Sequence, residues 1–164
     1  MLKESVIRFF GLRREIKNLR SQVEELSWDE PFGMLTRGAF LQHCRVMPRG
    51  RRVVAFIDLD EIHSLNRDLG YTEVDKRVKS TFSIPFRRSD LVARWYSGDE
   101  IVILFDCDVD GAELKIFQIR EAARKNGLAF TYEIGEWAVG HQSIIHVIDG
   151  LSNKNCKKAK TFRR

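Results

Sequence analysis

Apolar residues near the N-terminus repeat with the spacing of a helix. Their intervals alternate between three and four residues, and they occupy Phe9, Leu12, Ile16, Leu19, Val23 and Leu26. This pattern predicts one amphipathic helix over residues 3–27, about 35 Å long at the helical rise per residue. The same repeat places these residues at coiled-coil a and d positions. Residues 1–28 are therefore expected either to form a dimerising coiled coil or to pack on their own domain.

The remaining residues, 29–164, alternate between strand-like and helix-like patterns. The predicted strands are Val53–Ile57, Leu91–Tyr96, Ile101–Phe105 and Leu128–Trp137. The predicted helices are Leu35–Val46, a stretch ending at Leu69, Glu73–Phe82, Val109–Lys125 and, with weaker helix formers, Ile144–Lys160. The two middle strands are joined by a short glycine-containing turn that is typical of a hairpin. The order predicts an α/β sandwich in one domain, with a mainly antiparallel central sheet flanked by helices.

Composition agrees with one globular domain. The chain has 164 residues, of which 43% are hydrophobic and 31% charged. Its longest apolar runs, Val53–Ile57 and Ile101–Phe105, are far shorter than the roughly 20 residues that span a bilayer. Charged residues interrupt the apolar N-terminus, so it lacks the pattern of a secretory signal, and a cytoplasmic location is expected.

Three dispersed cysteines (Cys44, Cys107 and Cys156) form no CxxC pair and are expected to be reduced, structural thiols.

The formal net charge of +5 reflects a basic end. Six cations fall in the last eleven residues: Lys154, Lys157, Lys158, Lys160, Arg163 and Arg164. Such a run favours an anionic partner, such as a nucleotide, a nucleic acid or a membrane surface. A solvated tail without a partner is the alternative.

Two pairs of acids suggest chemistry. Asp58 and Asp60 follow the buried strand, and Asp99 and Glu100 lie in the hairpin turn. If the two strands are neighbours, the carboxylates meet at one edge of the sheet and repel one another unless a cation lies between them. Mg²⁺ prefers such oxygen ligands and retains sites for substrate phosphates. The pattern is typical of metal-assisted phosphoryl or nucleotidyl transfer, although four solvated loop acids would give the same sequence.

Five segments, in order and with matching spacing, resemble the GGDEF domains of diguanylate cyclases. The D-x-L-T-G-L-x-N-R-x-x-F motif of that family corresponds to residues 29–40, and D-x-D-x-F-K-x-x-N-D corresponds to 58–67. Asp75 stands at the acid of the family's G-H-x-x-G-D segment. The GGDEF motif itself appears as Ser97–Ile101, and the final A-K-x-x-G-R corresponds to 159–164.

The resemblance implies an enzyme that condenses two GTP molecules into cyclic di-GMP, with one GTP held by each domain of a homodimer. It implies that Asp58, Asp99 and the carbonyl of Leu59 bind Mg²⁺ or Mn²⁺. It also implies that Asp99 and Glu100 are the catalytic acids, and that a carboxylate helps to deprotonate the attacking 3′-hydroxyl. Cyclic di-GMP, as the product, would be a second ligand.

Seven further residues would bind substrate by the same resemblance. Asn66 and Asp75 would read guanine, since an Asp can accept from two donors that adenine lacks. Ser97 and Gly98 would let the backbone approach the nucleotide, and His63 stands at a phosphate-facing position that is Lys in the family. Lys160 and Arg164 would hold the triphosphate.

An inhibitory product site of the family, R-x-x-D, is matched by Arg87 and Asp90, although one extra residue separates Asp90 from the turn. Ser97, His63 and Val74 also depart from the family pattern. His63, Val74 and a last helix that has lost most of the family's packing residues leave open a second hypothesis, a weak or inactive domain that binds GTP or cyclic di-GMP as a regulator. A third, less favoured hypothesis is a nucleic-acid or anionic-surface module built on Lys154–Arg164.

Overall fold

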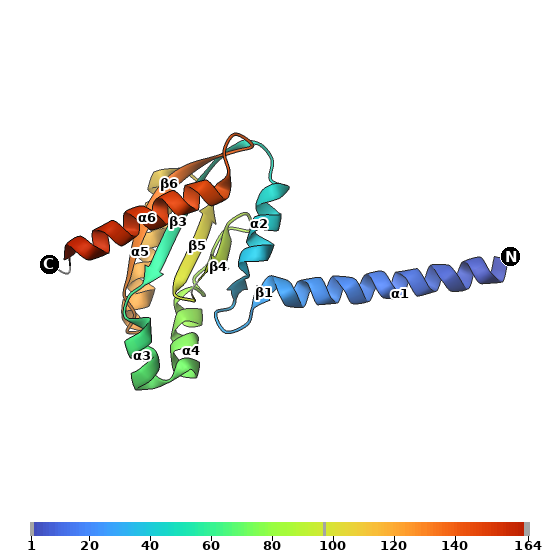
Figure 1. Cartoon of the computed structure of the whole chain (residues 1–164), viewed down its shortest axis with the longest axis horizontal. Coiled ribbons are helices and arrows are strands. Elements are labelled where there is room, and N and C mark those ends of the chain that lie inside the picture. Colours follow the sequence, from blue (N-terminus) through green and yellow to red (C-terminus); the bar gives the residue numbers. More distant parts are fainter. Residues whose placement is uncertain (1, 97, 163–164) are drawn as a thin grey trace.

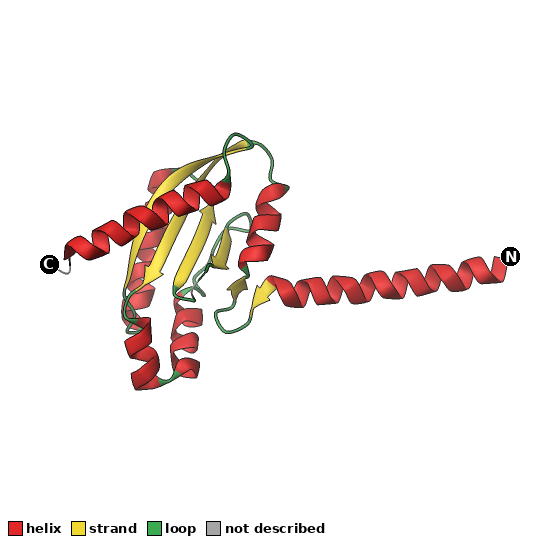
Figure 2. Ribbon diagram, in the orientation of Figure 1, coloured by secondary structure: helices red, strands yellow, loops and turns green. Residues whose placement is uncertain are grey.

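The computed structural model describes the backbone of residues 2–96 and 98–162, and the side chains of residues 12–13, 15–23, 25–96 and 98–156. The elements in chain order are α1 (Leu2–Ser27), β1 (Trp28–Asp29), β2 (Met34–Leu35), α2 (Arg37–Arg45), β3 (Gly50–Leu59), α3 (Ile62–Leu69), α4 (Tyr71–Thr81), β4 (Leu91–Arg94), β5 (Glu100–Phe105), α5 (Val109–Lys125), β6 (Phe130–Val139) and α6 (Ile144–Phe162). Helix α1 extends away from the α/β body, as Figures 1 and 2 show.

The six strands form one sheet in the order β1-β2-β4-β5-β3-β6. Every neighbouring pair is antiparallel except β2 and β4, which are parallel. The predicted mainly antiparallel α/β sandwich is therefore confirmed. The two-residue strands β1 and β2 were not predicted, because two residues carry no periodicity that a sequence pattern can reveal.

Helices cover both faces of the sheet. One apolar cluster joins alternate β3 residues, such as Ala55 and Ile57, to the inner faces of α3, α4 and α5. The other cluster joins the intervening residues Val54 and Phe56 to α2 and α6. Successive side chains of a strand point to opposite faces, so the continuous apolar run of β3 is buried on both sides.

Local sequence explains where the helices begin and end. The Thr36 hydroxyl accepts from the N–H of Ala39 at 3.4 Å and caps α2, and Asp108 caps α5 by accepting from the N–H of Gly111 at 2.9 Å. Gly127, at φ +68°, ends α5 where the sequence predicts. In the part of the chain that the structure describes, no helix combines the length and the apolar character that crossing a membrane requires.

Candidate functional site

Carboxylates from two adjacent strands meet at one end of the sheet. Asp58 of β3 is the antiparallel partner of Glu100, the first residue of β5. The N–H of Leu59 donates to the Asp99 carbonyl at 2.9 Å and fastens the end of β3 to the hairpin turn. Asp60 follows directly, and its N–H donates to the Ala129 carbonyl at 2.9 Å. The predicted meeting of the two acidic pairs at one sheet edge is thus confirmed, while their chemical roles stay predictions.

Asp58 and Glu100 share one face of the sheet. Phe56 and Val102, two residues away along each strand, belong to the apolar cluster that contacts α2 and α6. Because side chains alternate along a strand, Asp58 and Glu100 lie on this same face. Both are half-buried, at the point where the apolar core ends.

The turn between β4 and β5 is compact and depends on a glycine. The N–H of Trp95 donates to the Glu100 carbonyl at 2.8 Å, which continues the pairing one residue beyond β4. Gly98 has φ +92°, a backbone conformation that residues with a Cβ rarely adopt. A Cβ there would lie 2.6 Å from Nη2 of Arg94. Ser97 lies outside the described residues.

Arg94 supports the turn, although sequence reasoning did not select it. Its Nη1 donates to Oδ2 of Asp29 at 3.1 Å, and its guanidinium lies 4.0 Å from the centre of the Phe32 ring. The side chain therefore connects the acidic turn to the segment between β1 and β2. Its two partners are distant in sequence, so no local pattern pointed to this role.

The predicted guanine-reading residues lie on two helices that pack on each other and follow the acidic end of β3 (Figure 1). Within the described chain, the buried Oδ1 of Asn66 has no hydrogen-bond partner, so it retains the capacity to accept from a ligand. Asp75 is half-buried on α4, where its neighbour Val74 is buried in the core. His63 is exposed on α3. Roles for these three residues stay predictions.

Helix α6 carries the basic end of the chain. The buried Asn155 donates through Nδ2 to the Thr131 hydroxyl at 2.9 Å, and Thr131 is the β6 partner of Asp58. Lys160 lies five residues further along the helix, about 7.5 Å at the helical rise. The Lys160 side chain and the whole of Arg164 lie outside the described residues.

Arg87 and Asp90 form hydrogen bonds that stabilise the loop before β4, next to the C-terminal end of β5. The Asp90 carboxylate accepts from the N–H of Arg87 at 2.9 Å and from the N–H of Asp106 at 3.0 Å. The Arg87 guanidinium donates to the Asp106 carbonyl at 2.7 Å. These contacts lie roughly 17 Å from the acidic turn at the rise of a strand. They give the R-x-x-D segment a structural role, and product binding there stays a prediction.

Asp58, Asp99 and the Leu59 carbonyl are the predicted ligands of a magnesium ion. These three groups offer oxygen ligands only. Among the described side chains there is no group of three or more His, Cys, Asp or Glu residues placed to hold a metal by themselves. Mg²⁺ usually takes one or two carboxylates and completes its shell with water and substrate phosphates. The donor atoms have the chemistry that Mg²⁺ prefers, and metal binding at this end of the sheet stays a prediction.

Comparisons with known proteins find similarity in sequence to one curated protein and in fold to several solved structures. No family model matches the chain. The cyclic di-GMP phosphodiesterase NbdA of Pseudomonas aeruginosa is 30% identical over 111 residues, which cover 61% of this chain. The chain spans only 14% of the length of that curated protein.

Solved structures of GGDEF proteins are similar over most of the chain. The diguanylate cyclase SiaD of Pseudomonas aeruginosa, in complex with its activator SiaC, has a TM-score of 0.71 at 18% identity, covering 96% of this chain and 68% of that one. The coiled coil and GGDEF domain of DgcB from Caulobacter crescentus, in complex with c-di-GMP, has a TM-score of 0.67 at 17% identity, covering 87% and 89%. The S helix-GGDEF-EAL region of Vibrio cholerae LapD, bound to c-di-GMP, has a TM-score of 0.66 at 17% identity, covering 95% and 39%. These likenesses show the fold.

Proposed function

We propose that this chain, which has the fold of GGDEF domains, is a diguanylate cyclase that condenses two GTP molecules into cyclic di-GMP. One observation carries the proposal: Asp58 faces Glu100 across the β3–β5 pair while Leu59 is hydrogen-bonded to Asp99. Backbone pairing thereby brings Asp58, which the resemblance assigns to metal binding, beside Asp99 and Glu100, which it assigns to catalysis.

The carboxylates would act on the hydroxyl that attacks. In each half of the reaction, the 3′-oxygen of one GTP forms a bond to the α-phosphorus of the other, and the bond to the β-phosphate bridge breaks. Pyrophosphate leaves, and a carboxylate of the Asp99–Glu100 pair accepts the hydroxyl proton. Asp58, Asp99 and the Leu59 carbonyl would hold Mg²⁺ or Mn²⁺, which supplies charge stabilisation at the phosphates when bound.

Guanine selection would rest on α3 and α4. The buried Asn66 Oδ1 without a partner can accept a hydrogen bond from the base. Asp75 would accept from N1 and N2 of guanine, a donor pair that adenine does not present. Gly98 would permit close approach of the backbone, with Ser97 beside it. Toward the phosphates, His63 stands where the family has a lysine, whose fixed charge it lacks.

The triphosphate would be held from α6. The link between Asn155 and Thr131 fixes this helix beside Asp58, one to two turns before Lys160. Lys160 and Arg164 would supply cations for the phosphates. This assignment gives the basic end a ligand other than nucleic acid.

Catalysis would require a homodimer, because each domain holds one GTP. Helix α1 offers a means of dimerisation. Its apolar stripe is exposed, from 48% at Ile16 to 78% at Leu26. Two parallel helices that pair through this stripe would bury it. The Thr36 hydroxyl donates to the Leu26 carbonyl at 3.1 Å and attaches the end of α1 to the domain, so that pairing would also bring the domains together.

A regulator that binds GTP or cyclic di-GMP without turnover is the second candidate. The exposed His63 favours it, because a histidine there lacks the fixed charge with which the family's lysine holds phosphate. The test is incubation of the full chain with GTP and Mg²⁺, with chromatography of the nucleotides. Cyclic di-GMP supports the cyclase, whereas calorimetric binding of GTP with no product supports the regulator.

A further inference from the structure

The outer edge of β6 is an open, regular strand edge. Strand β6 is the last in the sheet order, and no strand in the described chain pairs with its outer side. Its inner side pairs with β3 over ten consecutive residues without a bulge, from Phe130 to Val139. Natural edge strands are usually blunted by prolines, bulges or lysines, because their unpaired N–H and C=O groups attract other strands. Strand β6 has no proline, bulge or lysine, and its charged residues are Glu133 and Glu136.

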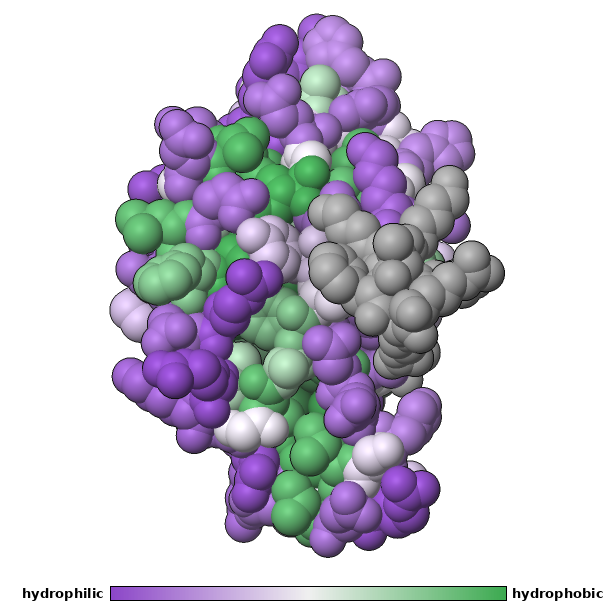
Figure 3. All heavy atoms as spheres, turned by 90° about the vertical axis from the view of Figure 1, so that its left-hand side faces the viewer, coloured by the Kyte–Doolittle hydropathy of each residue, from purple (hydrophilic) through white to green (hydrophobic). Residues whose placement is uncertain are grey.

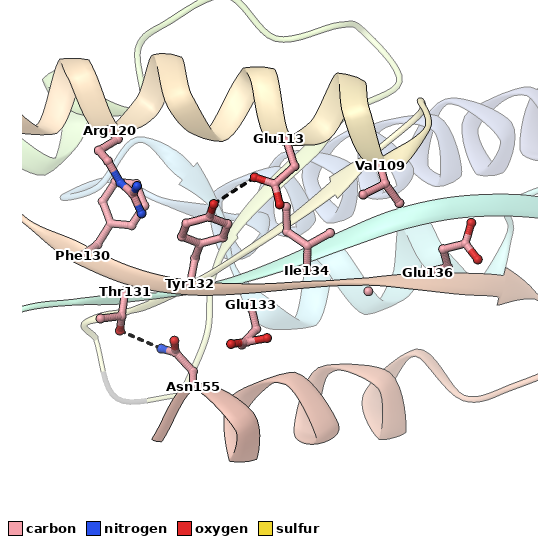
Figure 4. Close-up of a pocket in the computed structure, with 11 residues that line it drawn as sticks. Val109, Glu113, Arg120, Phe130, Thr131, Tyr132, Glu133, Ile134, Glu136 and Asn155 are labelled. Carbon is pink, nitrogen blue, oxygen red and sulfur yellow. Dashed lines mark hydrogen bonds between the residues drawn. The ribbon is translucent and has the colours of Figure 1, made fainter. Parts of the chain in front are cut away.

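A groove follows this edge between two helices. Figure 4 shows β6 with α5 on one side and α6 on the other. The groove has a volume of about 610 Å³, and the hydrophobic residues Val109, Phe130, Tyr132 and Ile134 line its α5 side. Figure 3 shows the side of the molecule on which β6 forms the edge, where hydrophobic surface interrupts the hydrophilic surroundings. An extended peptide, which alternates its side chains between two faces, fits a strand edge flanked in this way.

The excess of acidic residues in the groove favours a peptide with basic side chains. Its lining includes Glu113, Glu133 and Glu136 but one cation, Arg120. The Arg120 guanidinium is already placed over the Tyr132 ring, 5.0 Å from its centre. A second copy of this chain pairing edge to edge would bring a second set of these glutamates to the same interface, and like charges are unfavourable where they lie opposite one another. A basic partner meets the opposite charge.

A buried acceptor points to a ligand as well. Asn155 is 0% exposed and lines the α6 side of the groove. Its Nδ2 is used by Thr131, while in the described chain its Oδ1 has no hydrogen-bond partner. A buried acceptor without a partner is costly unless a donor arrives. A lysine ammonium or a peptide N–H would be such a donor.

We infer that the β6 edge binds an extended, lysine- or arginine-rich segment of a partner protein, which adds to the sheet as a further strand. Backbone hydrogen bonds along β6 would supply affinity, and the glutamates would supply the preference for basic side chains. The inference uses residues of β6, α5 and Asn155, and it does not depend on GTP turnover.

The test is titration of the full chain with a synthetic peptide that alternates lysine and valine over about eight residues, within the usual range of strand lengths. The comparison peptides carry glutamate in place of lysine, or N-methyl groups on alternate residues. The expected results are binding of the lysine peptide, at least about tenfold weaker binding of both comparison peptides, and amide-exchange protection on β6.

A matched pair of charge reversals locates the site. Glu136→Lys changes an exposed groove residue whose ion pair with Arg51 is itself exposed, so the fold should persist. It should weaken binding of the lysine peptide about three- to tenfold. Glu25→Lys makes the same charge change on α1, outside the groove, and should leave binding unchanged. Equal binding of the lysine and glutamate peptides, equal effects of the two variants, or protection confined to other elements would overturn the inference. So would occupation of the edge by a second copy.

Discussion

At the scale of single residues, the backbone conformation of Gly98 disfavours any residue with a Cβ at this position of the β4–β5 turn. Its φ is +92°, and an added Cβ would meet the Arg94 guanidinium. Gly98→Ala is therefore expected to lower the free energy of unfolding by about 1–3 kcal/mol. Gly150→Ala should do the opposite, by up to about 1 kcal/mol, because this helical glycine has nothing within 4 Å of an added Cβ. Urea unfolding of both variants measures whether the free energy of unfolding falls or rises. A stabilised Gly98→Ala variant would contradict the description of the turn.

The cysteines differ sharply in reactivity. Burial raises the pKa of Cys44 to about 12, whereas Cys156 is exposed. The thiolate is the reactive form, so iodoacetamide near pH 8 should label Cys156 and spare Cys44 until the protein unfolds. Since the folded pKa of Cys44 is raised, its stabilising contribution is complete below pH 9 and is lost as the pH rises toward 12. Mass spectrometry of native and urea-treated samples checks the order, which early labelling of Cys44 would refute.

The sequence was sufficient to predict that the acids lie close together, but it was not sufficient to predict the contacts that Arg94 makes beside them. Asp58 and Glu100 could be placed together from the sequence, because each follows or begins an apolar strand run. Arg94 could not, since its role depends on Asp29, sixty-five positions away in the chain, and on the ring of Phe32. Contacts of this kind follow from the tertiary fold and leave no local pattern.

At the scale of elements, the loop between α4 and β4 depends on Asp90. Its carboxylate accepts from two backbone N–H groups, those of Arg87 and Asp106. Asp90→Ala leaves both donors without this partner and is expected to lower the free energy of unfolding by about 1–3 kcal/mol. Arg88→Ala, at the exposed neighbouring position, should change it by less than about 0.5 kcal/mol. Thermal unfolding compares the stability of the two variants. Equal stability would contradict the conclusion that the hydrogen bonds of Asp90 stabilise this loop.

Element boundaries followed from sequence where a local signal existed. Helix α5 has the predicted bounds because Asp108 caps it and Asn126-Gly127 ends it. Helix α6 was less clearly predicted, since Ser152, Asn153 and Asn155 are weak helix formers. It forms because Ile148 and Leu151 pack on the sheet, a tertiary contribution that propensity does not contain.

At the scale of the whole molecule, α1 should control assembly. Leu19 is 53% exposed in the apolar stripe. Leu19→Lys would place a charge in the proposed helix–helix seam and should weaken dimerisation at least about tenfold. Asn18→Lys adds the same charge at an outward position and should have little effect. Sedimentation at several concentrations, with GTP present, distinguishes the variants. Identical behaviour of the two would exclude the coiled coil as the dimer contact.

The central claim is that the acids joined by the β3–β5 pair catalyse GTP condensation. The most direct measurement is the ratio of cyclic di-GMP to pyrophosphate formed by the full chain at high protein concentration with GTP and Mg²⁺. The account predicts two pyrophosphates for each cyclic di-GMP. It also predicts at least about a 100-fold loss of rate in Glu100→Gln, and an unchanged rate in Asp110→Asn on the distant start of α5. No cyclic di-GMP from the unaltered chain, or an undiminished rate in Glu100→Gln, would contradict it.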